Sequence, residues 1–166
     1  MKSVVIMGVA GCGKSSLAAE VAVAEGLPLV EGDEHHSASN RLKMQRGIPL
    51  DDGDRSGWLA SLGRALGDRP GGVVLTCSAL KRKYRDQLRE ALPGLRFVFM
   101  EISRDAAQAR VSARAEHFFS PRLVDSQFEA LEPPLGERQV LRVDALRDLA
   151  LLREEVSAWL RESEPG

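Results

Sequence analysis

Short apolar runs without polar alternation recur along the chain. The first covers residues 4–7, Val-Val-Ile-Met, and four similar runs follow it. Runs of this kind, rich in β-branched residues, are typical of strands that are buried on both faces of a parallel sheet. The predicted strands are residues 4–7, 28–30, 73–77, 96–102 and 140–143.

Segments with helical patterns lie between these runs. They cover residues 16–24, 58–66, 82–92, 105–114 and 146–160. Strands that alternate with helices predict an α/β domain with a parallel sheet and right-handed crossovers. No repeat or linker divides the chain, so we expect residues 1–166 to form a single domain. Residues 31–55 and 115–134 do not fit the alternation, and we predict that they are irregular insertions with binding or lid functions.

The composition is that of a folded domain with nearly balanced charge. The 166 residues are 43% hydrophobic and 28% charged, and the formal net charge is -1. Because such a chain has no long-range positive field, we expect neither a nucleic acid nor a membrane surface as its partner. Any recognition of phosphate must then come from locally placed groups.

The chain has two cysteines, Cys12 and Cys77, which are too few for a disulfide scaffold. The N-terminus lacks the layout of a signal peptide, and no apolar run approaches the roughly 18 residues that a membrane helix needs. We therefore expect a cytoplasmic protein with reduced thiols. A redox link between the two cysteines stays open.

A glycine-rich loop follows the first predicted strand and opens the first predicted helix. Residues 8–15, Gly-Val-Ala-Gly-Cys-Gly-Lys-Ser, match the phosphate-binding pattern in the setting that confirms it. Its glycines allow backbone amides to converge on a polyphosphate, Lys14 reaches the β and γ phosphates, and Ser15 can ligate Mg²⁺. The predicted contacts to ATP or GTP are Gly8, Val9, Ala10, Gly11, Cys12, Gly13, Lys14, Ser15 and Ser16.

Such a loop occurs in switches, motors and small-molecule kinases. The guanine-reading pattern Asn-Lys-x-Asp is absent, which disfavours a GTPase, and the short chain disfavours a motor. A compact kinase, which passes the γ phosphate to a bound acceptor, remains.

Acidic residues and histidines follow the second predicted strand. Ligands of doubly wound sheets bind at the carboxyl ends of the strands, so Glu31 and Asp33 should face the phosphate loop. Asp33 is the candidate that orients the acceptor hydroxyl and takes its proton, and Glu31 is a candidate for holding Mg²⁺ through water. A solvated acidic turn is the alternative. His35 and His36 lack further ligands at metal spacing, so hydrogen bonding to a polar acceptor is the better use.

Between the phosphate loop and about residue 133 the chain holds an ordered series of further motifs. They are Asp33, His36, Asn40, Lys43-Met44, Gly47, Pro49-Leu50, Asp52, Asp54-Arg55, Trp58-Leu59, Cys77-Ser78-Ala79-Leu80-Lys81, Tyr84-Arg85-Asp86, Arg114, His117-Phe118-Phe119, Gln127 and Leu131-Glu132. In these motifs and in their order the chain resembles the gluconokinase family. The resemblance implies a P-loop NTPase fold of the nucleoside-monophosphate-kinase type with a lid, often a homodimer. It also implies ATP-dependent, Mg²⁺-assisted conversion of D-gluconate to 6-phospho-D-gluconate.

Gluconate is a monoanion with several hydroxyls, so its site needs basic groups and hydrogen-bonding side chains. Lys81 and Arg85 are four residues apart at the start of a predicted helix, which would place them on one face; a solvated helix face is the alternative. His117, in the second insertion, looks like a histidine of the family that contacts the substrate. The predicted substrate contacts are Asp33, His36, Asn40, Arg55, Lys81, Arg85, His117 and Gln127, with Arg41 a weaker candidate.

Arg110 and Arg114 are four residues apart on the helix that leads into the second insertion. In a small kinase with a mobile lid such arginines neutralise charge on the transferred group, so we predict a lid at residues 115–122 and a substrate insertion at residues 33–58. The predicted catalytic residues are Lys14, Asp33, Arg110 and Arg114.

The chain departs from the family pattern at a few positions, namely Glu31, Ser37, Gly53 and Gly57. The longer side chain of Glu31, where family members often have Asp, puts its role at Mg²⁺ in question. Two other hypotheses stay open: a kinase for another small acceptor, of the shikimate or nucleoside monophosphate type, and an ATP-binding regulator without catalysis.

Overall fold

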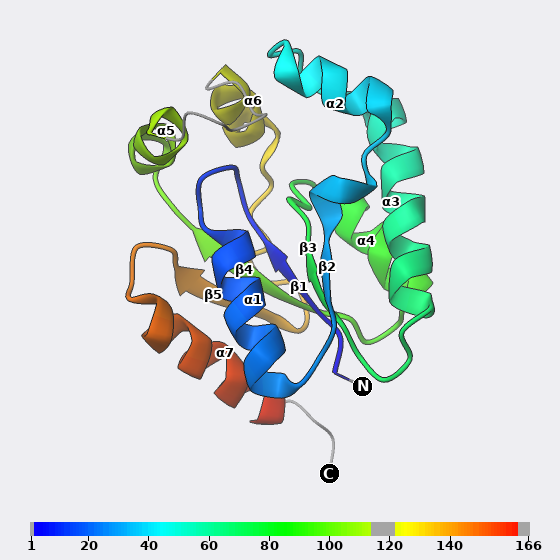
Figure 1. Ribbon diagram of the computed structural model, residues 1–166, viewed down its shortest axis with the longest axis vertical. Helices are drawn as coiled ribbons and strands as arrows, with labels where there is room; N and C mark the ends of the chain where they lie inside the picture. The colour runs from blue at the N-terminus through cyan, green and yellow to red at the C-terminus, as the bar shows by residue number, and fades with distance from the viewer. Residues whose placement is uncertain (1, 114–121, 163–166) are drawn as a thin grey trace.

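Residues 2–113 and 122–162 are the part of the chain that the computed structural model describes, and within it five strands form one parallel sheet (Figure 1). The strand order is β2-β3-β1-β4-β5. This confirms the predicted five-stranded parallel sheet. The strands are β1 Val4–Met7, β2 Leu29–Glu31, β3 Val74–Thr76, β4 Arg96–Glu101 and β5 Val140–Asp144.

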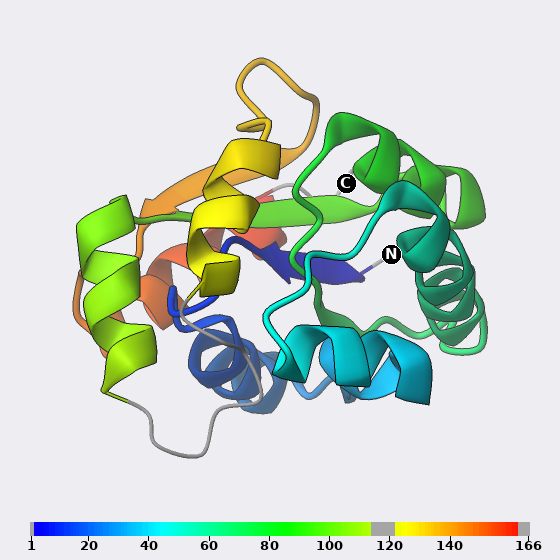
Figure 2. The ribbon, with the colours of Figure 1, turned by 90° about the horizontal axis from the view of Figure 1, so that it is seen from above.

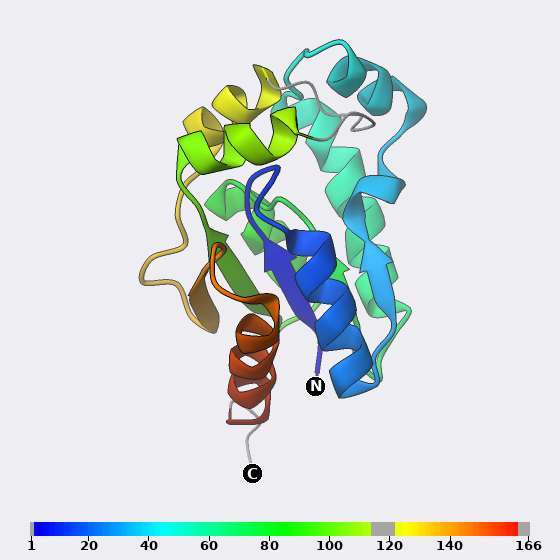
Figure 3. The ribbon, with the colours of Figure 1, turned by 60° about the vertical axis from the view of Figure 1, so that its left-hand side comes forward.

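Helices α1 and α7 lie side by side on one face of the sheet (Figures 1 and 3), and α3 and α4 pack on the other. Helices α2, α5 and α6 lie at the carboxyl ends of the strands, the end toward the viewer in Figure 2. The helices are α1 Lys14–Glu25, α2 Ala38–Gln45, α3 Asp52–Gly67, α4 Arg82–Ala91, α5 Arg104–Ser112, α6 Arg122–Ala130 and α7 Leu149–Glu162, with a 3₁₀ helix, η1, at Gly32–His35.

Strand β1 shows why its sequence lacks polar alternation. Val4 and Ile6 belong to the core beneath α1 and α7, whereas Val5 and Met7 belong to the core beneath α3 and α4. All four side chains are fully buried. A strand whose two faces are both covered needs apolar residues at every position.

The prediction of irregular structure at residues 31–55 and 115–134 is wrong for much of both segments. The first holds η1, α2 and the beginning of α3, and the second holds α6. Side chains cap these helices: Ser37 Oγ accepts a hydrogen bond from the amide of Asn40, and Asp51 and Asp54 form a reciprocal capping box at α3. Helix α2 buries only Asn40 and Met44, so its apolar periodicity in the sequence is weak.

Residue 122 of the predicted lid opens α6, and the rest of that lid lies outside the described residues. In the described part of the chain no helix has the length and apolar character needed to cross a membrane.

Candidate active site

The phosphate loop connects β1 to α1 and packs against α5. Gly11 has a φ of +83°, in the left-handed region, and a Cβ there would lie 2.9 Å from the carbonyl oxygen of Ala107 in α5. Lys14 opens α1, and its Nζ donates to the carbonyl oxygens of Gly8 at 3.0 Å and Val9 at 3.1 Å. The ammonium group is thereby held over the loop, where the γ phosphate of a bound nucleotide would lie.

Three oxygen-bearing side chains meet where β1, β2 and β3 end. Ser15 Oγ and Thr76 Oγ1 both donate to Oε2 of Glu31, at 3.0 and 2.7 Å. Hydroxyl and carboxylate oxygens are the donors that Mg²⁺ prefers. The longer side chain of Glu31 therefore still brings its carboxylate to Ser15, and the residues fit a metal ion that accompanies a nucleotide.

Helix η1 presents Asp33 and His36 directly after β2, and Gly32 makes its position possible. A Cβ on Gly32 would lie 2.0 Å from the carbonyl oxygen of Thr76, so only glycine fits. The Gly32 amide donates to Thr76 Oγ1 at 3.1 Å, and its carbonyl accepts from Trp58 Nε1 at 2.8 Å. The turn that carries Asp33 is thus fixed to β3 on one side and to α3 on the other.

His36 is a neutral imidazole held in a defined orientation. Its ring stacks on Trp58, with centroids 4.1 Å apart and an angle of 19° between the planes. Burial, with the nearby positive charges of Arg55 and Arg41, lowers the pKa of His36 from 6.5 to about 4. Asn40 Nδ2 donates to the Asp54 carbonyl and lies 3.3 Å from His36 Nδ1, which assigns the ring proton to Nε2. His36 can therefore donate one hydrogen bond without carrying charge.

A cleft brings four predicted substrate contacts together from distant parts of the chain: Asp33, His36, Arg55 and Gln127. Gln127 on α6 also accepts a hydrogen bond from the amide of Ala10, in the phosphate loop, at 2.6 Å. The cleft therefore adjoins the phosphate loop. Its other lining residues are Met44, Pro49, Leu50, Trp58, Ser78, Leu123 and Ser126.

A second hollow shares the Arg55 side of this cleft and adds Lys81. Arg55 Nη1 donates to the Leu50 carbonyl at 3.0 Å and to the Tyr84 hydroxyl at 3.3 Å. Lys81 Nζ lies 3.4 Å from a carboxylate oxygen of Asp52, which opens α3. The structure thus places two of the predicted basic groups, Arg55 and Lys81, at one wall of the acceptor region.

Arg110 lies at a different cleft, on the far side of the phosphate loop. Its Nη1 donates to the carbonyl oxygens of Gly11 and Cys12, both at 3.2 Å, and its Nη2 to that of Ala145 at 3.5 Å. The cleft has a volume of about 410 Å³ and includes Leu149 and Leu152 of α7. Arg110 is therefore fixed beside a partly apolar cavity and against the phosphate loop, and its role at the transferred phosphate stays a prediction.

The prediction that Arg85 binds the substrate is wrong in this structure. Its side chain is fully buried and forms an ion pair with Glu137. Lys81 is the N-cap of α4 and has an extended backbone, so the i, i+4 rule does not place it on the same helical face as Arg85. The two side chains point to different surroundings.

Arg114 and His117 lie outside the described residues, so their predicted roles are untested. Trp58 and Ser78 line the cleft but are not among the predicted site residues. Ser78 lies two residues after the end of β3, and the rule that indicates Asp33, the carboxyl end of a parallel strand, also applies to it.

Cys77 lies buried beneath these groups. Burial raises the pKa of its thiol to about 12; the negative charge of Asp33 adds to the shift, and the positive charges of Lys14 and Arg55 oppose it. These three groups from separate elements are therefore close enough to act on one atom. Cys12 and Cys77 are both buried free thiols.

Comparisons with known proteins agree with this geometry. A family profile described as an AAA domain matches residues 4–134. The thermosensitive gluconokinase of Escherichia coli K12 is 38% identical over 158 residues, which are 93% of this chain and 84% of the relative. The crystal structure of a gluconokinase from Sinorhizobium meliloti 1021 has a TM-score of 0.88 at 45% identity, covering 96% of this chain and 91% of that one. A sugar kinase from Janibacter sp. HTCC2649 has a TM-score of 0.92 at 38% identity, covering 98% and 96%. This chain is therefore a P-loop kinase that belongs to the gluconokinase family.

Proposed function

We propose that this protein transfers the γ phosphate of ATP to the 6-hydroxyl of D-gluconate and forms 6-phospho-D-gluconate. The main observation in support of this function is the cleft that brings Asp33, neutral His36 and Arg55 together beside the phosphate loop. It offers a carboxylate for the reacting hydroxyl, a neutral donor for a sugar hydroxyl and a cation for the acid group. The names of the relatives support the same substrate.

On the nucleotide side, the loop amides and Lys14 bind the phosphates, and the 410 Å³ cavity beside Arg110 takes the base. Ser15 would hold Mg²⁺ directly and Glu31 through water, because their oxygens already lie together. Bound there, Mg²⁺ would neutralise charge that develops on the phosphates.

On the acceptor side, Asp33 orients the 6-hydroxyl and accepts its proton as the phosphoryl group is transferred. His36 donates from Nε2 to a hydroxyl of gluconate, and Arg55 with Lys81 holds the carboxylate of gluconate at its other end. A substrate held at both ends presents one hydroxyl to the phosphate. The homodimer that the resemblance implies would be tested by analytical ultracentrifugation.

The test is ADP formation with ATP, Mg²⁺ and a panel of gluconate, other sugar acids, shikimate and nucleoside monophosphates. We expect turnover with gluconate and a fall in kcat of about 10²- to 10⁴-fold in Asp33→Asn with unchanged ATP affinity. The neighbouring exposed residue supplies a control, Glu34→Gln, which should stay close to wild type. Turnover only with another acceptor would show that gluconate is not the substrate. ATP binding without acceptor-dependent formation of ADP would favour the hypothesis of an ATP-binding regulator.

A further inference from the structure

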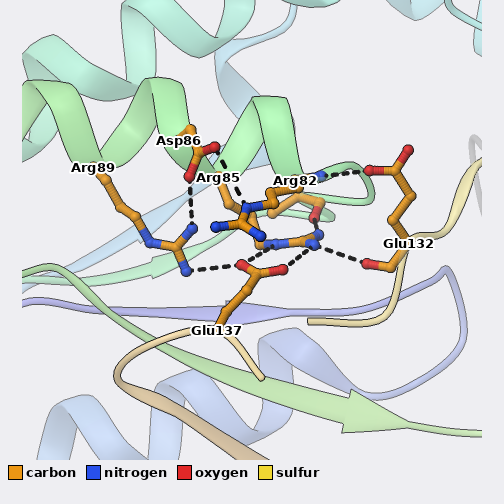
Figure 4. Close-up of polar contacts among 7 residues, drawn as sticks. Arg82, Arg85, Asp86, Arg89, Glu132 and Glu137 are labelled. Carbon is orange, nitrogen blue, oxygen red and sulfur yellow. Dashed lines mark hydrogen bonds and ion pairs between the residues drawn. The ribbon is translucent and has the colours of Figure 1, made fainter. Parts of the chain in front are cut away.

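Arg85 is the centre of a buried polar cluster that joins α4 to the segment after α6 (Figure 4). Its Nε and Nη2 donate to the two carboxylate oxygens of Glu137, at 3.0 and 2.6 Å. Its Nη1 donates to the Ala79 carbonyl at 2.7 Å, and Nη2 also donates to the Glu132 carbonyl at 2.8 Å. One guanidinium therefore ties three chain segments together.

Glu137 stays charged although its side chain is only 5% exposed. Burial by itself would raise the pKa of Glu137, but hydrogen bonds from Arg85 and Arg89 hold it below its usual value. Arg89 Nη2 donates to Oε1 of Glu137 at 2.9 Å, and its Nη1 to Asp86. Within the described residues, Arg89 thus supports Glu137 but bonds neither the Ala79 nor the Glu132 carbonyl, which makes it a natural comparison for Arg85.

The bond to Ala79 fixes a strained backbone. Ala79 has a φ of +47°, a left-handed conformation that a residue with a Cβ adopts at some cost. Ser78, its neighbour, lines the acceptor cleft, and the Leu80 carbonyl accepts from the Glu132 amide at 2.7 Å. The loop between β3 and α4 is therefore held in an unusual shape by the segment after α6 and by Arg85.

The two segments that Arg85 joins both lead to residues that line the acceptor cleft. Ser78 lines it from the loop after β3, which forms the Ser78 wall, and Ser126 and Gln127 line it from α6, which forms the α6 wall. Gln127 in turn accepts from the Ala10 amide in the phosphate loop. A shift of the loop after β3 relative to α6 would change both the width of the cleft and its distance from the phosphate.

We propose that Arg85 is a positioning residue for the acceptor, because it holds the Ser78 wall of the cleft at a fixed distance from the α6 wall. It does not touch the substrate and acts through the Ala79 and Glu132 carbonyls. The inference rests on the proposed function only for the identity of the acceptor. Misplacing reacting groups by about 1 Å can cost about 10²-fold in rate, so a small shift of this wall is measurable.

The test compares Arg85→Lys with Arg89→Lys. Lysine keeps the charge beside Glu137 but, as a single ammonium, cannot reproduce the planar fork that joins Glu137, Ala79 and Glu132. We expect Arg85→Lys to lower kcat/KM for gluconate roughly 10- to 100-fold through a raised KM, with KM for ATP within about twofold of wild type. Arg89→Lys should leave both KM values within about twofold.

A purely structural role would lower thermal stability or change both KM values alike, and either result without a selective rise in the acceptor KM overturns the proposal. Should Arg85→Lys fail to fold, Ala79→Gly is added, because glycine removes the cost of the positive φ. The double variant, Arg85→Lys with Ala79→Gly, must show the same selective rise in the KM for the acceptor. Wild type is assayed first; if it uses another acceptor of the panel, the comparison is made with that acceptor, so failure of the substrate assignment is distinguished from failure of the positioning role.

Discussion

The neutral state of His36 predicts a specific dependence of stability on pH. The folded protein keeps this imidazole unprotonated because it is buried against Trp58 beside Arg55 and Arg41. The unfolded chain exposes it, and it then takes up a proton near its ordinary pKa of 6.5. Between 6.5 and about 4 the unfolded state therefore binds more protons than the folded state, so stability is fully present above pH 6.5 and falls as the pH is lowered to about 4.

The size of this effect follows from the two pKa values of His36, 6.5 and about 4. Each unit corresponds to about 1.4 kcal/mol, so the whole difference is worth roughly 3 kcal/mol. At pH 5 about 2 kcal/mol of it is already lost. The carboxyl groups whose pKa values are lowered, among them Asp54 and Glu137, contribute at more acidic pH and leave the range from 7.5 to 5 mainly to histidine.

The assay is urea unfolding at pH 7.5 and 5.0 for wild type and His36→Asn. The variant loses the stack on Trp58 and is less stable at pH 7.5, but its loss on going to pH 5.0 should be smaller than that of wild type by about 2 kcal/mol. His35→Asn, at the neighbouring histidine, is measured in parallel as the matched control. An equal loss in His36→Asn and wild type would show that His36 titrates normally in the folded protein and would refute its assignment as a neutral donor.

Three further substitutions test the packing around the site. Gly32→Ala should destabilise the protein by roughly 3 kcal/mol in urea unfolding, because the new Cβ would meet the Thr76 carbonyl; wild-type stability would contradict the close approach of η1 to β3. Gly57→Ala, inside α3 with open space around its Cβ position, should instead stabilise by about 0.5 to 1 kcal/mol, and a loss would contradict the open surroundings of that position. Gln127→Glu keeps an acceptor for the Ala10 amide but adds negative charge beside the phosphate loop, so calorimetry should show ATP binding weakened roughly tenfold; unchanged affinity would place α6 away from the nucleotide.

The sequence predicts the sheet and the phosphate loop because their determinants are local. A doubly covered strand shows its apolar run within a few residues, and the loop of residues 8–15 has its chemistry in one contiguous stretch. The contact of Ser15 with Glu31 also follows from a simple rule, since carboxyl ends of parallel strands meet at one edge of the sheet.

The roles of Arg85 and Arg110 depend on partners that no local pattern reveals. Arg85 pairs with Glu137, which is 52 positions away, and Arg110 reaches the Gly11 carbonyl, which is 99 positions away. The four-residue spacing that made each a candidate describes its own helix and not the surface against which that helix packs. The same limit applies to α6: the family resemblance gives Gln127 as a site residue, but no local pattern predicts its hydrogen bond with the Ala10 amide of the phosphate loop.

At the carboxyl end of this sheet, arginine side chains donate hydrogen bonds to backbone carbonyls, as neighbouring strands do within the sheet. Loops that leave the strands have carbonyl groups without partners in regular structure, and buried carbonyls need donors. A guanidinium has five donors in a rigid plane and can donate to several carbonyls at once.

Three arginines donate to backbone carbonyls in this way. Arg85 donates to Ala79 and Glu132, Arg110 to Gly11 and Cys12, and Arg41 to Asp33 and His36. Each of these loops carries or adjoins a residue of the proposed site, so the geometry of catalysis depends on arginines that need not touch either substrate. Replacing such an arginine with lysine keeps the net charge but removes the planar fork, and this is why kinetic effects of these variants should follow the lost geometry rather than the charge.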